Sequence, residues 1–506
     1  MTRAPYFVGL DLGTSAVKAI VFDSTFRAIH GTRLALTTTS GDDGRSEQDP
    51  DLVFRIAARA LARAITAVGA HRVRAIGLAA HRSSATLLEP VTATFHAPLV
   101  LWNDRRSADV ATRLADSHRG ALLARASGLP VLPFTFACRA LWMRQQPRWR
   151  HALASGRVKL VTADVALAHV LTGGAAFATD PSFSARTQLA KVRDGAWSDA
   201  LLRAAGVERA WLAPVLPTLA ARGATSARCA RGLPAGIPIL ASVADQSASA
   251  IGLGLTAQDV VGLTFGTGAF AVRVGARRDR DRGRFPIVLV GRGEHATHAV
   301  EANDPSTGTS IARVAEWLDV RDAAELERLA RAHRDDTLVF VPAVSGLGAP
   351  WLAPNARAAW SGLHAGTTRA DLAEAALRGV ALRASELVDE LDPSGRRAVL
   401  VAGGGATHDA MLQRLADVSG RTIRRAATSE TTARGAALLT ALACTGSGDR
   451  GGLDDLADAR VRCETDASWT PRTTQRDRSL QRRRFANAVT ALLSSADARA
   501  TSRHGT

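Results

Sequence analysis

Two short turns rich in glycine, threonine and serine have the composition of phosphate-binding loops. The first, DLGTS at 11–15, is followed by Lys18, and the second is GTG at 266–268. Backbone N–H groups in such turns can donate to phosphate oxygens, while hydroxyl groups and a cation offset the charge. An acidic residue at the start of the turn, here Asp11, can hold a hydrated Mg²⁺. Ordinary hairpin turns favour the same residue types, so each turn alone leaves both interpretations open.

The elements around these turns predict two α/β halves that begin in the same way. Residues 7–23 and 259–274 each consist of two apolar, β-rich runs joined by a polar tip, which is typical of a hairpin. Strand-like runs at 73–79, 98–102 and 158–163 alternate with helical stretches, which favours α/β layering.

Further helices and one strand are predicted from caps, periodicity and turn residues. Residues 51–68 are expected to be helical, with Asp49 as N-cap and Pro50 in the first turn. Helices are also expected within 366–392 and 430–445. A strand at 398–402 should lead into a glycine-rich turn at 403–406 and a helix to about Ser419.

The composition is that of a globular protein and argues against several partner classes. The 506 residues are 46% hydrophobic and 22% charged, and no run approaches ~18 uninterrupted apolar residues. We therefore expect no membrane partner, and no basic-then-apolar leader precedes Phe7. Four scattered cysteines indicate free thiols in a cytoplasmic protein. The net charge of +17 would suggest nucleic acid, but the arginines are dispersed, so no nucleic-acid partner is expected.

Several common catalytic motifs are absent. The chain has no GxxxxGK[ST], HExxH or GxSxG, and no GxGxxG in a strand–turn–helix context. A P-loop enzyme, a zinc protease, an α/β-hydrolase and a dinucleotide-binding fold are therefore disfavoured.

Ten segments occur in the order typical of one enzyme family. The chain resembles the FGGY carbohydrate kinases, relatives of actin and the Hsp70 ATPase, and is most similar to the glycerol kinase branch. The segments are GLDLGTSAVKAIVFD (9–23), SEQDP (46–50), AIGLAAHRSS (75–84), LVLWNDRRS (99–107), SGLPVLPF (127–134), LASVADQSASAIGLGL (240–255), LTFGTGAF (263–270), FVPAVSGLGAPWLAPNARAAWSGL (340–363), VAGGGATHD (401–409) and ETTARGAAL (430–438).

The resemblance implies an α/β fold of two actin-like (ribonuclease H-like) domains with an active-site cleft between them. An N-terminal domain at 1–250 would bind the acceptor and carry the first phosphate hairpin and the catalytic aspartate. A C-terminal domain at 251–495 would bind the nucleotide, and 496–506 would be a disordered tail. The family transfers the γ-phosphoryl group of ATP to a hydroxyl of a sugar or polyol, with Mg²⁺ as cofactor. Its members are often dimers or tetramers, which implies a homo-oligomer here.

The resemblance also implies a role for each matching residue. Asp245 stands at the position of the general base; considered without the resemblance, it would be a helix N-cap. Asp11 and Asp245 would hold the metal. The acceptor would be bound by Arg82, Ser83, Trp102, Phe134, Asp245, Gln246 and Phe270. The nucleotide would be bound by Thr14, Ser15, Lys18, Gly266, Thr267, Gly308, Gly404, Gly405, Ala406 and Asp409.

The acceptor pocket departs from the glycerol kinase pattern. Glycerol kinases typically show Arg-Glu where this chain has Arg82-Ser83, and Tyr where it has Phe134. Both changes remove a hydrogen-bond partner for a small triol, so we expect an acceptor other than glycerol, with more room beside Ser83. Asp409 replaces a common Asn, Lys18 a common Arg, and Arg378 an acidic or amide residue, which should alter a local salt bridge.

Two other functions stay open at this stage. A ketose kinase of the xylulokinase type is favoured by the GGGATH turn at 403–408, whereas Arg82 and GLGAPW (346–351) favour the glycerol kinase side. A basic, nucleotide-regulated binding protein without transfer activity is the alternative from another class.

Overall fold

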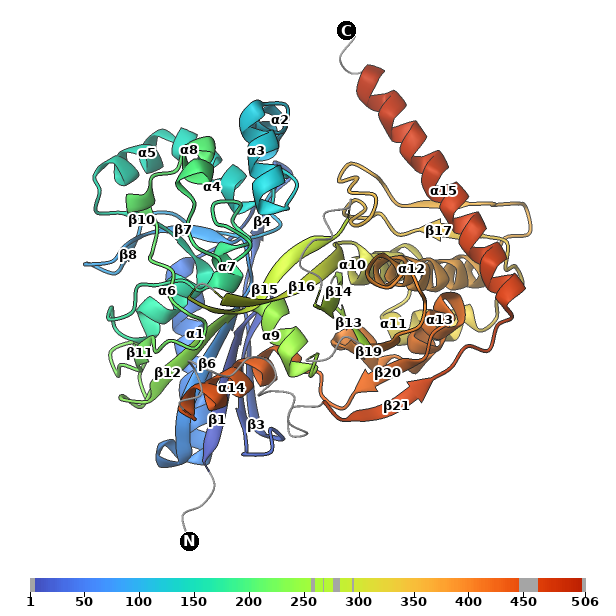
Figure 1. Ribbon diagram of the computed structural model, residues 1–506. Helices are drawn as coiled ribbons and strands as arrows, with labels where there is room; N and C mark the ends of the chain where they lie inside the picture. Colours follow the sequence, from blue (N-terminus) through green and yellow to red (C-terminus); the bar gives the residue numbers. More distant parts are fainter. Residues whose placement is uncertain are drawn as a thin grey trace. The chain divides into compact units, whose positions relative to one another are not determined.

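The chain forms two compact units (Figure 1). The computed structural model describes residues 5–255, 260–266, 268–275, 283–293, 295–445 and 463–502, with side chains as far as residue 494. The first unit comprises Met1–Thr256, Pro286–Ala299 and Glu430–Arg462, and the second comprises Ala257–Phe285, Val300–Ser429 and Cys463–Thr506. Among the described residues, no helix combines the length and the apolar character needed to cross a bilayer.

The main sheet of the first unit has six strands in the order β11-β12-β6-β1-β2-β3. Their bounds are β11 (Gly223–Ala224), β12 (Pro238–Ala244), β6 (Val73–Ala80), β1 (Tyr6–Leu12), β2 (Ala16–Phe22) and β3 (Ala28–Ala35). The predicted first hairpin is confirmed as β1 and β2, which pair antiparallel. Strands β1, β6 and β12 run parallel, as expected for strands covered by helices on both faces.

Helices cover both faces of this sheet (Figure 1). Helix α1 (Pro50–Val68) begins as predicted, because the Asp49 side chain accepts from the Leu52 N–H and Pro50 is the first helical residue. It packs with α6 (Ala163–Leu171) against Val8, Leu10 and Leu12 of β1. The other residues of β1 face α14 (Thr431–Cys444), whose Ala433 and Ala437 contact Phe7. Side chains of β1 therefore alternate between two cores.

A second, smaller sheet completes the first unit. Its order is β10-β7-β9-β5-β4, with β8 beside β7. The remaining elements, listed in chain order, are β4 (Thr39–Ser40), β5 (Ser46–Gln48), β7 (Ala85–Glu89), β8 (Thr94–Phe95), β9 (Leu99–Val100), α2 (Ala108–Ala115), α3 (His118–Ser127), α4 (Phe136–Gln145), α5 (Pro147–Ala154), β10 (Lys159–Thr162), α7 (Pro181–Ser184), α8 (Asp199–Ala205), α9 (Asp245–Gly252) and β15 (Phe285–Arg292).

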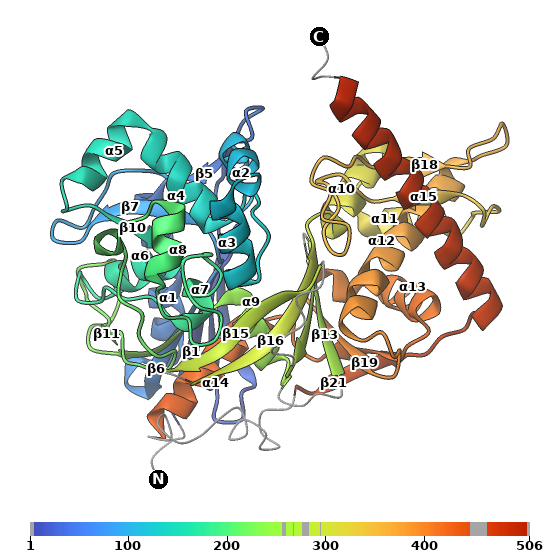
Figure 2. The same ribbon diagram turned by 45° about the horizontal axis from the view of Figure 1, so that its top comes forward.

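The second unit is built on strands β14 (Ala269–Val274), β13 (Val260–Phe265), β19 (Ala398–Ala402), β20 (Ile423–Ala426) and β21 (Thr465–Trp469), adjacent in that order (Figure 1). Figure 2 shows β13, β19 and β21 from another side. The predicted second hairpin and the strand at 398–402 are confirmed. Strands β13, β19 and β20 run parallel, while β21 pairs antiparallel with β20. The remaining elements are β16 (His295–Asp304), which ends in this unit, α10 (Thr307–Trp317), α11 (Ala323–Ala330), β17 (Val339–Val341), β18 (Ala359–Ser361), α12 (Arg369–Leu391), α13 (Asp409–Ser419) and α15 (Gln475–Ser502).

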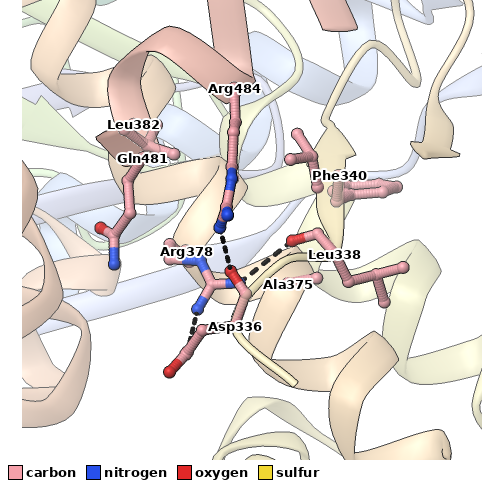
Figure 3. Close-up of a pocket in the computed structure, with 10 residues that line it drawn as sticks. Asp336, Leu338, Phe340, Ala375, Arg378, Leu382, Gln481 and Arg484 are labelled. Atoms are coloured by element: carbon pink, nitrogen blue, oxygen red, sulfur yellow. Dashed lines mark hydrogen bonds and ion pairs between the residues drawn. The ribbon is translucent and has the colours of Figure 1, made fainter. Parts of the chain in front are cut away.

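Arg378 of α12 forms an ion pair with Asp336 (Figure 3), and the expected change of a local salt bridge relative to the family stays a prediction. Its Nη1 lies 2.7 Å from Asp336 Oδ1, and its Nη2 donates to the carbonyls of Asp336 and Leu338 at 3.2 and 3.0 Å. Arg484 of α15 points to the same Asp336 carbonyl. The cavity among these side chains measures about 10 Å³, room for at most one water molecule, so the cluster joins elements and is no ligand pocket.

The unit boundaries differ from the predicted contiguous division at residue 250. Segments 286–299 and 430–462 count with the first unit although they follow it in the chain. A division of functional roles at residue 250 stays a prediction. The disordered tail predicted for 496–506 stays a prediction; α15 continues to Ser502 through an alanine-rich stretch that favours helix.

Four glycines let α14 approach the main sheet of the first unit and helix α9 at backbone distance. Side chains at Gly9 and Gly77 would overlap the carbonyls of Ala433 and Ala436 in α14. Where α9 crosses α14, a side chain at Gly252 would overlap the Thr431 carbonyl, and one at Gly435 the Ala248 carbonyl. Helix α14 therefore sits directly on β1, β6 and α9.

We expect Gly435→Ala to destabilise the protein by roughly 1–3 kcal/mol or more, because the new methyl group meets backbone atoms that cannot rotate away. Urea unfolding followed by circular dichroism measures the loss. Gly404→Ala is the control, since a methyl group there meets no atom within 4 Å. Equal unfolding midpoints for the two variants would contradict the close packing.

Candidate active site

Three parallel strands of the first unit end at the same level of the sheet. The residues that follow them form the candidate site. Leu12 of β1 lies opposite Ala80 of β6, which lies opposite Ala244 of β12. The residues that follow each strand therefore meet at one edge of the sheet, where ligands bind in open α/β sheets. This edge carries Thr14 and Ser15 after β1, Arg82 and Ser83 after β6, and Asp245 after β12.

Asp11 and Lys18 face each other across the first hairpin. They are paired residues of β1 and β2, and Lys18 Nζ lies 2.8 Å from Glu430 Oε2 at the start of α14. Burial raises the pKa of the Asp11 carboxyl to about 7; the Lys18 ammonium opposes the rise, and the carboxylates of Asp245 and Glu430 add to it. A cation placed among these carboxylates would relieve their repulsion.

Asp245 is the first residue of α9 and contacts Arg82. Arg82 Nε lies 3.3 Å from Asp245 Oδ1, with 8% of the Arg82 side chain and 26% of the Asp245 side chain exposed. The same carboxylate oxygen accepts from the Gln246 N–H at 2.8 Å. Ala244 occupies the N-cap, so the N-cap role suggested for Asp245 by sequence alone is wrong. The Gln246 Oε1 atom is buried and accepts no hydrogen bond from a described residue.

A buried hydrogen-bond chain that the sequence did not reveal fixes the start of α9. The Ala244 N–H donates to Ser182 Oγ at 2.8 Å, and Ser182 Oγ donates to Asp180 Oδ1 at 2.6 Å. Thr218 Oγ1 donates to the other Asp180 oxygen at 2.6 Å. Because Asp180 is fully buried, this chain holds the backbone next to Asp245 in place.

Arg139 of α4 organises the predicted acceptor residues and was also missed. Its guanidinium donates to the Ser83 carbonyl and, at 3.2 Å, to the Trp102 carbonyl. Burial lowers the pKa of Arg139 to about 10, so it remains charged at neutral pH. Trp102 Nε1 in turn donates to Thr14 Oγ1 at 3.0 Å, which joins the acceptor residues to the phosphate hairpin. A buried arginine that donates hydrogen bonds to carbonyls distant in the sequence leaves no local sequence pattern by which it could be predicted.

The two residues that depart from the glycerol kinase pattern lie in the same unit. Ser83 has a φ of 64°, a left-handed backbone that serine rarely adopts. Phe134 precedes α4 and is 39% exposed. Phe270, also predicted to contact the acceptor, lies half-buried on β14 of the second unit.

In the second unit, a glycine turn lies beside the start of α10. The Gly266 N–H donates to the Gly268 carbonyl at 2.9 Å, and a side chain at Gly268 would overlap the Asp304 carbonyl. Buried Asp304 accepts from the Ser306 N–H and Thr307 Oγ1 at 3.2 and 3.1 Å. Gly308 follows in the first turn of α10. Thr267 lies outside the described residues.

A cavity of about 250 Å³ opens where β19 and β20 end. Ala406 lines it, whereas Gly404, Gly405 and Asp409 do not. A side chain at Gly405 would overlap the Phe265 ring, so this glycine serves packing against β13. The described residues that line the cavity are Ala402, Gly403, Ala406, Thr407, Arg425, Ala426, Ala427, Thr428, Ser429 and Asp466.

The residues present fit a magnesium ion held mainly by phosphate and water. Among the described residues, no three His, Cys, Asp or Glu side chains form a metal-binding group. Mg²⁺ in kinases commonly takes only one or two carboxylates and completes its shell with phosphate oxygens and waters. Asp11 and Asp245 supply two carboxylates near enough for the charge of one to raise the pKa of the other.

Comparison with known proteins identifies the class of enzyme. The family model for the N-terminal domain of the FGGY family of carbohydrate kinases matches residues 6–252, and the model for the C-terminal domain matches 296–444. These matches define a phosphotransferase acting on an alcohol group. The chain belongs to the FGGY family of carbohydrate kinases, which phosphorylate sugars or polyols with ATP.

Relatives within the family carry different acceptor names. The chain is 33% identical over 456 residues to a glycerol kinase of Xanthobacter autotrophicus, covering 87% of this chain and 90% of the relative. It is 31% identical over 443 residues to an apulose kinase of Pectobacterium atrosepticum, covering 86% and 89%. The fold matches Plasmodium falciparum glycerol kinase with ADP (TM-score 0.84, 20% identity, 97% and 98% covered). It also matches a ligand-bound xylulose kinase from Lactobacillus acidophilus (TM-score 0.85, 17% identity, 97% and 99% covered).

We expect Asp11→Asn to make the protein more stable and less active. Because the pKa of Asp11 is raised in the folded state, its ionisation costs stability progressively from about pH 4 to pH 7, and the full cost remains above pH 7. The variant lacks this cost, so at pH 8 its Tm should rise by roughly 2–5 °C, while Mg²⁺-dependent ADP release falls. Thermal unfolding at pH 8 and pH 4 measures the difference, which should shrink at the lower pH. Asp42→Asn, at an exposed position, is the control; a Tm for Asp11→Asn below that of the wild type at pH 8 would contradict the prediction.

Proposed function

We propose that the chain transfers the γ-phosphoryl group of Mg²⁺-ATP to a hydroxyl of a polyol or sugar other than glycerol, with Asp245 as general base. The observation that carries the proposal is the register of β1, β6 and β12, which brings Asp11, Arg82 and Asp245 to one sheet edge. The family membership supplies the reaction, and the residues at this edge supply the roles.

Each residue at the edge has a task suited to its chemistry. The Asp245 carboxylate accepts the proton of the acceptor hydroxyl as the phosphoryl group arrives, and Arg82 orients that carboxylate. Lys18, together with the Thr14 and Ser15 hydroxyls, offsets phosphate charge. Asp11 and Asp245 hold the metal, and Mg²⁺ neutralises phosphate oxygens when bound. In the second unit, the 266–268 turn and Gly308 contact phosphate, and the cavity beside Ala406 takes the nucleobase.

The acceptor is inferred from what the pocket lacks. Ser83 and Phe134 offer neither the carboxylate nor the phenol that glycerol kinases present, and the smaller Ser83 leaves space. A ketose kinase is the second candidate, favoured by the GGGATH turn and by the similarity to an apulose kinase. We place the protein in the cytoplasm as a homo-oligomer, a dimer or tetramer by kinship, with no nucleic-acid or membrane partner.

A panel of acceptors tests the reaction. Purified protein with Mg²⁺-ATP should release ADP in a coupled assay only with certain members of a panel of glycerol, tetritols, pentitols, hexitols and ketopentoses. Asp245→Asn should lower kcat by roughly 10²–10⁴-fold, because the proton acceptor is lost, while calorimetry still detects ATP binding. Asp199→Asn, at an exposed position of the same unit, should leave kcat unchanged. ADP release by Asp245→Asn at the wild-type rate would refute the role of Asp245, and release with no acceptor would refute the enzyme class.

The inference that the acceptor is not glycerol is tested by restoring the two residues that glycerol kinases typically show. We expect Ser83→Glu with Phe134→Tyr to raise kcat/KM for glycerol by roughly tenfold or more, because two hydrogen-bond partners are restored. The value for the best longer acceptor should fall as the space beside residue 83 is filled. Ser83→Gln with Phe134→Tyr is the control of similar size without the charge. Glycerol emerging as the best acceptor of the wild type by kcat/KM would overturn the inference.

A further inference from the structure

Arg425 lines the 250 Å³ cavity and forms ion pairs with two carboxylates that approach it from different directions. No other described residue that lines the cavity is held in this way. It lies on β20, opposite Val401 of β19, at the edge where both parallel strands end. The cavity wall around it is formed largely by small residues, including Ala402, Ala406 and Ala426. Such a wall admits a flat ring and leaves Arg425 as its largest side chain.

The plane of the Arg425 guanidinium is fixed by its partners. Its Nη1 donates to Asp409 Oδ1 at 2.7 Å, and its Nε donates to Asp466 Oδ1 at 2.8 Å. Both bonds lie along N–H directions, so together they set the orientation of the planar group. Trp469 supports it from one side, with Arg425 Cζ 5.3 Å from the ring centroid. These contacts orient the guanidinium as a flat surface beside the cavity.

The local charge favours a nucleobase as the group that contacts this surface and disfavours a phosphate. Arg425 contributes one positive charge, while Asp409 and Asp466 contribute two negative charges, so the cluster repels a polyanion. A neutral aromatic ring gains from stacking on a guanidinium and carries no such penalty. The two carboxylates therefore offset the positive charge of Arg425, while the flat face of its guanidinium remains available for stacking.

We propose that Arg425 is a specificity-determining residue for the nucleotide, whose guanidinium stacks on a purine base while Asp409 and Asp466 hold its plane. The proposal rests on the proposed function, because it takes the cavity as the nucleobase site. A purine offers a larger stacking surface than a pyrimidine, so Arg425 favours ATP over CTP. Asp409, predicted from the sequence to contact the nucleotide, acts here through Arg425 as a positioning residue.

Binding and kinetics with three probes test the proposal. The probes are Mg²⁺-ATP, Mg²⁺-CTP and Mg²⁺ with inorganic triphosphate, titrated by calorimetry into wild type and variants. Arg425→Ala should weaken ATP binding by roughly 5- to 100-fold, shrink the preference for ATP over CTP, and leave triphosphate binding unchanged. KM for ATP should rise by the same factor while KM for the acceptor stays constant. Arg425→Lys should fail to restore ATP affinity, since an ammonium lacks the flat face.

Two further variants keep the result interpretable. Arg424→Ala removes the same charge from the exposed neighbouring position of β20, whose side chain points to the opposite face of the strand, and should change nothing. Asp466→Asn keeps Arg425 but loosens its plane, and should give a smaller loss of ATP affinity if Arg425→Ala fails to fold. Equal weakening of ATP and triphosphate, or unchanged ATP affinity in both Arg425→Ala and Asp466→Asn, would overturn the proposal. Wild type that binds no ATP would instead refute the proposed function.

Discussion

The contact of helix backbones with the main sheet of the first unit is the constraint on which the candidate site depends. Gly9, Gly77, Gly252 and Gly435 remove the side chains that would separate β1, β6, α9 and α14. At this spacing the helices cannot slide without backbone overlap, so the ends of three strands and the starts of two helices are fixed together. Asp11, Asp245 and Glu430 lie at those ends.

The cost of this arrangement is electrostatic. The same close packing that positions three carboxylates also raises the pKa of Asp11 and makes its charge unfavourable for folding. Arg82 and Lys18 offset part of the repulsion through their contacts with Asp245 and Glu430. Under the proposed function, a divalent cation bound beside Asp11 and Asp245 would relieve this repulsion.

The sequence predicted those parts of the fold that local patterns encode. The two hairpins, the capped helix after Asp49 and the strand at 398–402 depend on alternation, caps and turn residues within short windows. The roles of the residues of the first hairpin and of Asp245 were predicted from the resemblance of their segments to a family, and they stay predictions. Arg139, Ser182 with Asp180, and the Asp409–Arg425–Asp466 cluster were not found, because each acts on groups distant in the chain.

The late position of α14 has a consequence for synthesis on the ribosome. The strand face that carries Phe7, Ile20 and Phe22 is covered by a helix that begins only at Thr431. A nascent chain that has emerged through α9 therefore exposes an aromatic and aliphatic surface until the distant helix leaves the exit tunnel. At about 5–20 residues per second, that interval is on the order of tens of seconds, long enough for a chaperone to occupy the vacant face.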